Sequence, residues 1–226
     1  MFPPIVVTER FVADVVNSDT SVADRLKVLF VPDYGITIAE RIIPAADLSE
    51  QISLAGTEAS GTGNMKFCLN GAHTIGTRDG ANIEIEEEVG TENMFLFGLS
   101  AEEVAEGADW YDPRWHLDHE PRVRSAVEYL LGETFAWKDP AMFTRLESSL
   151  IDEGDQWRLL ADLGSYLDAQ EAVDRRFADR DAWWRSAVLN TARGGRFSSD
   201  RAIREYASRV WQVTPSPTPD RVDHGL

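Results

Sequence analysis

The spacing of apolar positions divides the chain near residue 110 into two parts with different periodicities. Residues 26–31 and 94–97 are apolar nearly throughout, which is typical of strands buried on both faces of a parallel sheet. Residues 74–76 predict another strand, and residues 36–43, 45–53 and a segment starting near Asn64 predict helices. Because strands alternate with helices, this part of the sequence predicts an α/β layer with parallel strands.

The second part of the chain has helical periodicity. It predicts helices over residues 123–131, 141–151, 163–177, 180–193 and 199–211. In the last of these, Ile203, Tyr206, Ala207 and Val210 form an apolar stripe. Ser100 is expected to cap a helix, and residues 159–161 are a candidate strand. The seven tryptophans are scattered over helical positions, and we expect them in the core rather than on a surface that stacks against carbohydrate.

The two ends of the chain differ from the middle. Pro3 and Pro4 should stop any helix, and residues 5–7 have a short β-like pattern. We therefore expect residues 1–13 to be a divergent segment and residues 14–214 to form one domain portion, α/β to about 110 and mainly helical after. Residues 215–226, with Pro217 and Pro219, are expected to be a disordered tail.

Composition narrows the possible partners. A net charge of −17 argues against nucleic acid and anionic membranes, and no apolar run approaches the ~20 residues that span a bilayer. The single cysteine, Cys68, excludes an internal disulfide and is expected to be a buried filler residue, which fits a cytoplasmic protein. The acidic run at 86–88 is expected to be a solvated face, and no metal site is predicted.

The most informative stretch is rich in small residues and ends on a lysine. Ser60-Gly61-Thr62-Gly63 predicts a tight turn before a helix, where free N–H groups favour an anion. It is not a P-loop, because Thr62 stands at the lysine position, and not a dinucleotide motif, because Lys66 replaces the third glycine. The same pattern is equally typical of a turn before a helix with a surface lysine.

Lysine can form a Schiff base with an aldehyde cofactor once its amine is neutral. Apolar neighbours such as Met65, Phe67 and Leu69 suggest a desolvated amine at Lys66, since burial disfavours the charged form. The Thr62 hydroxyl and the Gly63 N–H, within five residues of Lys66, suit a phosphate. These features favour pyridoxal 5′-phosphate, although only weakly by themselves.

Residues 58–66 resemble the pyridoxal-phosphate attachment signature of the α-glucan (glycogen, starch and maltodextrin) phosphorylases. The resemblance extends over about 14–215, through segments 43–51, 70–72, 74–77, 79–82 and 196–201 and Asn93. It implies a partial Rossmann-like C-terminal domain of a GT-B enzyme with a helix-rich C-terminal half. It further implies phosphorolysis of terminal α-1,4-glucosidic bonds by inorganic phosphate to glucose 1-phosphate, with the cofactor's phosphate group as acid/base.

The resemblance also assigns roles residue by residue. Lys66 would hold the cofactor as a Schiff base, and Thr62 and Gly63 would bind its phosphate. Gln51 would support these residues without touching the cofactor directly. The remaining assignments place Tyr34, Gly35 and Ile36 along the cofactor pocket, and Glu58, Ser60 and Gly61 on the hydroxyls of the glucosyl unit. His73 stands where many relatives have an apolar residue and is interpreted as a tolerated variation.

The departures from the family pattern suggest alternatives. The chain lacks the family's N-terminal domain, the early strands of the C-terminal domain and the basic segment that grips phosphate, so we expect it to be inactive alone. The alternative is a truncated, non-catalytic module that binds cofactor or partner. A transaminase-like enzyme is not supported by the residues near Lys66. The family is usually homodimeric, and the missing strands predict self-association.

Overall fold

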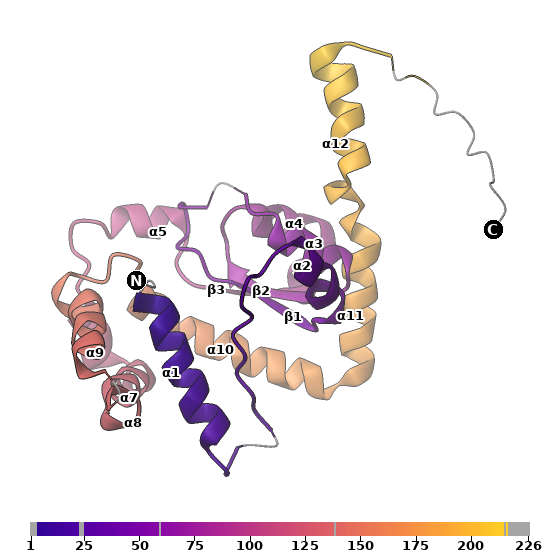
Figure 1. Cartoon of the computed structure of the whole chain (residues 1–226). Coiled ribbons are helices and arrows are strands. Elements are labelled where there is room, and N and C mark those ends of the chain that lie inside the picture. The colour runs from indigo at the N-terminus through magenta and orange to yellow at the C-terminus, as the bar shows by residue number, and fades with distance from the viewer. Residues whose placement is uncertain (1–3, 23–24, 59, 138, 215, 217–226) are drawn as a thin grey trace.

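A computed structural model of the chain describes residues 4–22, 25–58, 60–137, 139–214 and 216, with side chains from residue 10 onward. Its centre is a three-stranded parallel sheet with strands in sequence order, and helices surround it (Figure 1). The predicted α/β class with parallel strands is therefore confirmed. The expected tail at 215–226 lies outside the described residues, apart from residue 216.

The sheet is built around its middle strand. Leu48–Gln51 (β1), His73–Thr77 (β2) and Phe95–Phe97 (β3) are all parallel, and every residue of β2 is buried. Gly76 is needed in β2, because a Cβ there would lie 2.7 Å from the Gln51 carbonyl oxygen and from Asn82 Nδ2. The absence of a side chain at Gly76 thus lets the end of β1 and the first turn of α4 (Ala81–Val89) pack closely against β2.

Short helices connect and flank these strands in the first part of the chain. They are Ile36–Ile42 (α2), Gly63–Leu69 (α3), Ala81–Val89 (α4) and Ala101–Glu106 (α5). Ser100 caps α5 through a reciprocal capping box with Glu103, as the sequence predicted. Helices α3 and α4 are the connections between consecutive parallel strands.

The second part is helical, as predicted. Its helices are Pro113–His119 (α6), Pro121–Leu131 (α7), Glu133–Ala136 (α8), Pro140–Glu147 (α9), Leu159–Ala178 (α10), Arg180–Arg193 (α11) and Ser199–Glu205 (α12). π-Helical turns extend α9 through Ser148–Asp152 and α12 through Tyr206–Trp211. Aspartates at 112, 139 and 179 cap α6, α9 and α11 by accepting backbone N–H groups, which explains where these helices begin.

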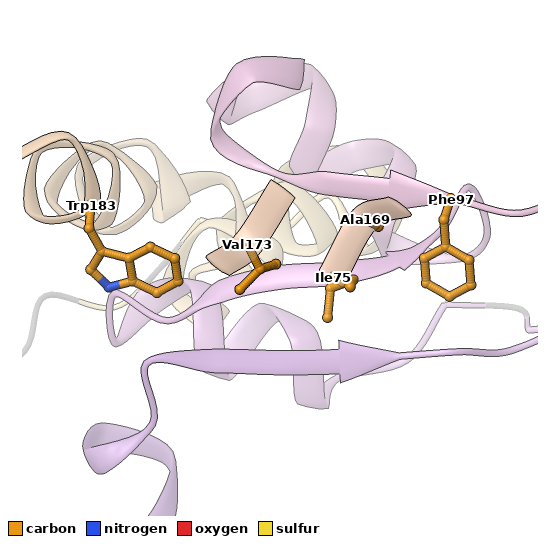
Figure 2. Close-up of a cluster of buried hydrophobic side chains, with 5 residues drawn as sticks. All are labelled: Ile75, Phe97, Ala169, Val173 and Trp183. Carbon is orange, nitrogen blue, oxygen red and sulfur yellow. The ribbon is translucent and has the colours of Figure 1, made fainter. Parts of the chain in front are cut away.

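The main core lies between the sheet and the two long helices. Figure 2 shows the cluster formed by Ile75, Phe97, Ala169, Val173 and Trp183. Ile75 and Phe97 come from β2 and β3, and the others come from α10 and α11. The long helices therefore cover the apolar face of a sheet that would otherwise be open to water.

The strand predicted at residues 26–31 is wrong. This segment has no regular secondary structure and no strand partner, and the Leu29 side chain is 72% exposed. At Val28 the backbone hydrogen bonds are made by a side chain instead of a neighbouring strand. The Asn17 side chain donates to the Val28 carbonyl and accepts from the Val28 N–H. Apolar character alone cannot make a strand, since the backbone groups also need a partner.

Three other local expectations are also wrong. A helix, Pro4–Ser18 (α1), begins where Pro4 was expected to stop one, because proline is well tolerated at the first helical position. Residues 45–53 contain the end of a 3₁₀ turn (Ile43–Ala45) and β1 instead of a helix, since pairing with β2 outweighs helix propensity. Residues 159–161 are the first turn of α10.

The expected burial of the tryptophans is wrong as well. Trp183 is 1% exposed, but the other six tryptophans are between 52% and 75% exposed. The stripe on the last helix is formed, yet Ile203, Tyr206 and Val210 are exposed and only Ala207 is buried. In Figure 1, α12 extends away from the rest of the fold, which is consistent with the exposure of this stripe.

Candidate functional site

The glycine-rich stretch lies at the carboxyl ends of β1 and β2, the edge where open α/β sheets usually bind ligands. A small cavity of about 30 Å³ is found there. It is lined by Gln51, Ser53, Glu58, Ser60, Gly61, Asn64, Thr77, Asp79 and Asn82. The fold thus brings Gln51, Glu58, Ser60 and Gly61, four of the site residues predicted from the sequence, around one point.

Asp79 anchors the loop that carries Glu58. Its Oδ2 accepts hydrogen bonds from the N–H groups of Thr57 at 3.2 Å and Glu58 at 2.7 Å. The N–H of Ala81 donates to the Ser60 carbonyl at 2.7 Å. Gly80, between Asp79 and Ala81, has φ +49°, and a Cβ there would lie 2.5 Å from the Ser60 carbonyl oxygen. The turn after β2 therefore fixes the residues on both sides of position 59.

Two buried asparagines join the helices behind this loop. Asn64 donates to Asn82 Oδ1 at 2.9 Å, and Asn82 donates to the Thr77 carbonyl at 2.9 Å. This links the first turns of α3 and α4 to the end of β2. These hydrogen bonds of Asp79, Asn64 and Asn82 were not predicted from the sequence. The signal was present as polar residues at element starts, but their partners could not be inferred.

Gln51 lies next to the start of α3. Its Nε2 donates to Ser49 Oγ at 2.8 Å and would be 4.0 Å from a Cβ placed on Gly63. Thr62, at the N-cap, makes no side-chain capping bond, and Gly61 has φ +78°. The hydroxyl of Thr62 is thus not used for capping, and the first N–H groups of a helix have no acceptor within it.

Lys66 lies one turn along α3, and its side chain is exposed. The expectation that its neighbours keep the amine dry is wrong, because consecutive residues face different sides of a helix. Cys68 illustrates this, since it is buried two positions later. Among the described residues the Lys66 amine has no hydrogen-bond or ion-pair partner. It is open to a ligand that approaches from outside.

The other predicted pocket residues lie apart from the cavity. Tyr34, Gly35 and Ile36 are exposed at the start of α2 and do not line it. Lys66 does not line it either. The residues expected to bind sugar, Glu58, Ser60 and Gly61, therefore line one cavity together with Gln51. Thr62 and Gly63 follow directly in the chain, whereas residues 34–36 do not line this cavity.

Buried groups near the site are consistent with structural roles. Cys68 contacts the Asn190 carbonyl at 3.5 Å, and burial raises the pKa of its thiol to about 11. It is the buried filler that the sequence predicted.

The acidic residues of α4 form ion pairs on its surface. Glu84, Glu87 and Glu88 pair with Arg196 at 3.7, 3.3 and 2.9 Å. Among the described residues no cluster of three or more His, Cys, Asp or Glu side chains could hold a metal. None of the described helices combines the length and apolarity needed to span a bilayer.

The chain is similar in sequence to known proteins over most of its length. The sequence profile of the family described as carbohydrate phosphorylase matches residues 5–213. Similar proteins include a glycogen phosphorylase of Synechocystis sp., 51% identical over 90% of this chain, and one of Chlamydia pneumoniae, 52% identical over 89%. The brain form of human glycogen phosphorylase is 48% identical over 91%. The chain spans about a quarter (24%) of the length of each of these relatives.

Proposed function

Because the chain belongs to the carbohydrate phosphorylase family, we propose that it carries the cofactor-binding part of an α-glucan phosphorylase. The reaction proposed for the enzyme is phosphorolysis of terminal α-1,4-glucosidic bonds of glycogen or a related glucan, which releases glucose 1-phosphate. The observation that carries the proposal is the meeting of Gln51, Glu58, Ser60 and Gly61 at the carboxyl edge of the sheet, just before the Lys66 helix.

The residues present fit pyridoxal 5′-phosphate at two points. Lys66 offers an amine without a partner among the described residues, and the turn before it has no Cβ at Gly61 or Gly63. Thr62 supplies a hydroxyl that is not used for capping. We propose that Lys66 holds the cofactor, that Thr62 and Gly63 bind its phosphate, and that Gln51 supports Gly63. When bound, the cofactor would supply the phosphate group that acts as acid/base.

The residues assigned to the sugar have suitable chemistry. Glu58 is exposed and its backbone is fixed by Asp79, so its carboxylate is available to accept two sugar hydroxyls. Ser60 and Gly61 would add further polar contacts. Tyr34, Gly35 and Ile36 are exposed and so available to contact the cofactor. We place this site in the cleft of a two-domain GT-B enzyme working in the cytoplasm on glucan and inorganic phosphate.

Labelling with pyridoxal phosphate tests the assignment of Lys66. The chain contains three lysines, Lys27, Lys66 and Lys138. Incubation with the cofactor, borohydride reduction and peptide mapping should place most of the label on Lys66. Lys27 is the matched control, since it is also exposed but has no adjoining glycine-rich turn. Label spread equally over Lys27 and Lys66 in folded protein would mean that exposure alone governs the reaction.

The second candidate is a non-catalytic module that binds cofactor without turnover. The size of the cavity favours it for the isolated chain, because about 30 Å³ holds a water molecule but not a sugar ring. We therefore expect no phosphorolysis by this chain alone. An assay with glycogen and phosphate decides between the two, and release of glucose 1-phosphate by the 226-residue chain would eliminate the second candidate.

A further inference from the structure

A second, larger cavity lies between α5, α6 and the start of α10. Its volume is about 550 Å³, within the range of small-molecule sites. It shares no lining residue with the cavity at the glycine-rich turn. Its chemically distinctive lining residues are Trp110, Tyr111, Trp115, Glu106, Asp112 and Arg158.

Two tryptophans that line this cavity, Trp110 and Trp115, leave much of their indole surface exposed to solvent. Trp110 is 75% exposed and Trp115 is 52% exposed, although indole is one of the largest apolar surfaces a side chain can bury. The Trp115 ring is nevertheless held in place, because it stacks on His119 with centroids 4.5 Å apart and an interplanar angle of 15°. The cavity thus presents large, partly ordered aromatic surface to solvent.

The wall formed by Tyr111 is fixed from behind. Tyr111 Oη donates to Asp155 Oδ2 at 2.7 Å, and Asp155 is buried and also accepts from the Leu160 N–H at 2.8 Å. The Arg158 guanidinium lies 4.0 Å above the centre of the Tyr111 ring. Asp155 and Arg158 both have left-handed backbone conformations, which are unfavourable for residues with a side chain. The wall is therefore ordered before any ligand arrives.

The mixture of charges selects the class of ligand. Three carboxylates line the cavity, but that of Glu103 already accepts from the Ser100 N–H at 2.8 Å, which leaves Glu106 and Asp112 as acceptors, while Arg158 places N–H donors there. A cation would be repelled by the guanidinium. An anion would be repelled by the carboxylates and by the net charge of −17. A neutral ring with several hydroxyls suits all three groups, since each hydroxyl both donates and accepts.

We propose that this cavity binds a neutral sugar ring, with its apolar face against the indoles and its hydroxyls on the charged groups. The choice of a short α-glucan as the ligand rests on the proposed function. The existence of a sugar site does not, because it follows from the lining residues alone. The cavity would be a second carbohydrate site on this chain, separate from Glu58 and its neighbours.

Calorimetric titration of the full chain with maltotriose, without cofactor, tests the proposal. We expect binding that weakens about tenfold or more in Trp110→Ala, because the stacking surface is lost. Trp110 is so exposed that its removal should leave the fold intact. Glu106→Gln should weaken binding severalfold, because the charge-assisted acceptor is lost. Trp211→Ala is the matched control, since Trp211 is similarly exposed but does not line this cavity.

Other variants and probes separate this site from the glycine-rich turn. Glu58→Gln removes the carboxylate assigned to the sugar at the glycine-rich turn, so it reports on maltotriose bound there, whatever the outcome of the Lys66 labelling. Loss of binding in Glu58→Gln but not in Trp110→Ala would place the sugar at the turn and overturn the proposal. Absence of maltotriose binding would overturn it too, as would displacement of the sugar by tetramethylammonium or inorganic phosphate.

Discussion

At the scale of single residues, His73 has the least usual environment. It is fully buried in β2, with its ring centroid 4.0 Å from that of Trp183 and 6.1 Å from that of Phe95. Neither ring nitrogen has a hydrogen-bond partner among the described residues. Burial lowers the pKa of the imidazole from 6.5 to about 4. His73 thus behaves as an apolar residue at neutral pH, in agreement with its interpretation as a tolerated variation.

This environment predicts a pH-dependent stability. Because the unfolded chain binds a proton near pH 6.5 and the folded chain only near pH 4, unfolding takes up a proton between these values. The contribution of His73 is full above pH 6.5 and is lost as the pH falls to about 4. The total loss is about 3 kcal/mol in free energy of unfolding, at 1.36 kcal/mol per pKa unit.

Urea denaturation of the parent chain and His73→Leu at pH 7.5 and pH 4.5 measures this contribution. Carboxylates that titrate in the same range affect both proteins, so the difference between them isolates the imidazole. We expect His73→Leu to lose markedly less stability on acidification than the parent. Parallel losses would show that the imidazole is solvated in the folded state.

At the scale of elements, the loop after β1 depends on the turn after β2. Asp79, in the turn after β2, accepts hydrogen bonds from the N–H groups of Thr57 and Glu58 in the loop after β1. The loop and the turn are adjacent only because β1 and β2 are paired. A charged, largely buried acceptor with two backbone donors is among the stronger hydrogen-bonding arrangements. The position of Glu58 is therefore a property of the sheet and not of its own sequence neighbours.

Replacing Asp79 should release this loop. Asp79→Ala leaves two N–H groups without their acceptor, and we expect a loss of about 2–3 kcal/mol in free energy of unfolding. Amide hydrogen exchange at Thr57 and Glu58 should accelerate, because these groups lose their protection. The control is Asp139→Ala, which removes the cap of α9 and should cost about 1 kcal/mol. Equal exchange at Thr57 and Glu58 in the two variants would show that Asp79 does not hold the loop.

At the scale of the whole molecule, apolar surface is concentrated where elements lack neighbours. Residues 26–31 are unpaired, β1 is an edge strand, and the side chains along the last helix are exposed. Open strand edges and exposed apolar segments favour association between chains. The net charge of −17 opposes such association at low ionic strength.

Self-association should therefore increase with both protein concentration and salt. Sedimentation velocity at low salt and at about 0.5 M salt, where the Debye length is only a few ångströms, measures it. Leu29→Glu should reduce association if residues 26–31 take part, because Leu29 is exposed there. Val188→Glu, at an exposed apolar position on α11, is the control for added charge. A single sharp monomer at high concentration and high salt would contradict this prediction.

Much of the fold was determined by local sequence signals. The capping box at Ser100, the helix carrying Lys66, the strand at 74–76 and the long helices depend on interactions within a few residues. Such signals can be recognised along the chain, because capping, positive φ and periodicity involve only neighbouring positions. The residues of the glycine-rich turn could be identified in the same way.

Only the tertiary structure decided which apolar segments are paired and which polar residues meet. Residues 26–31 are as apolar as a buried strand, yet they remain outside the sheet, while residues 48–51 join it against their helix propensity. The anchoring of Glu58 by Asp79 and the exposure of Lys66 likewise depend on how the elements pack. Burial and pairing require partners from distant parts of the chain, and a pattern of neighbouring residues does not specify those partners.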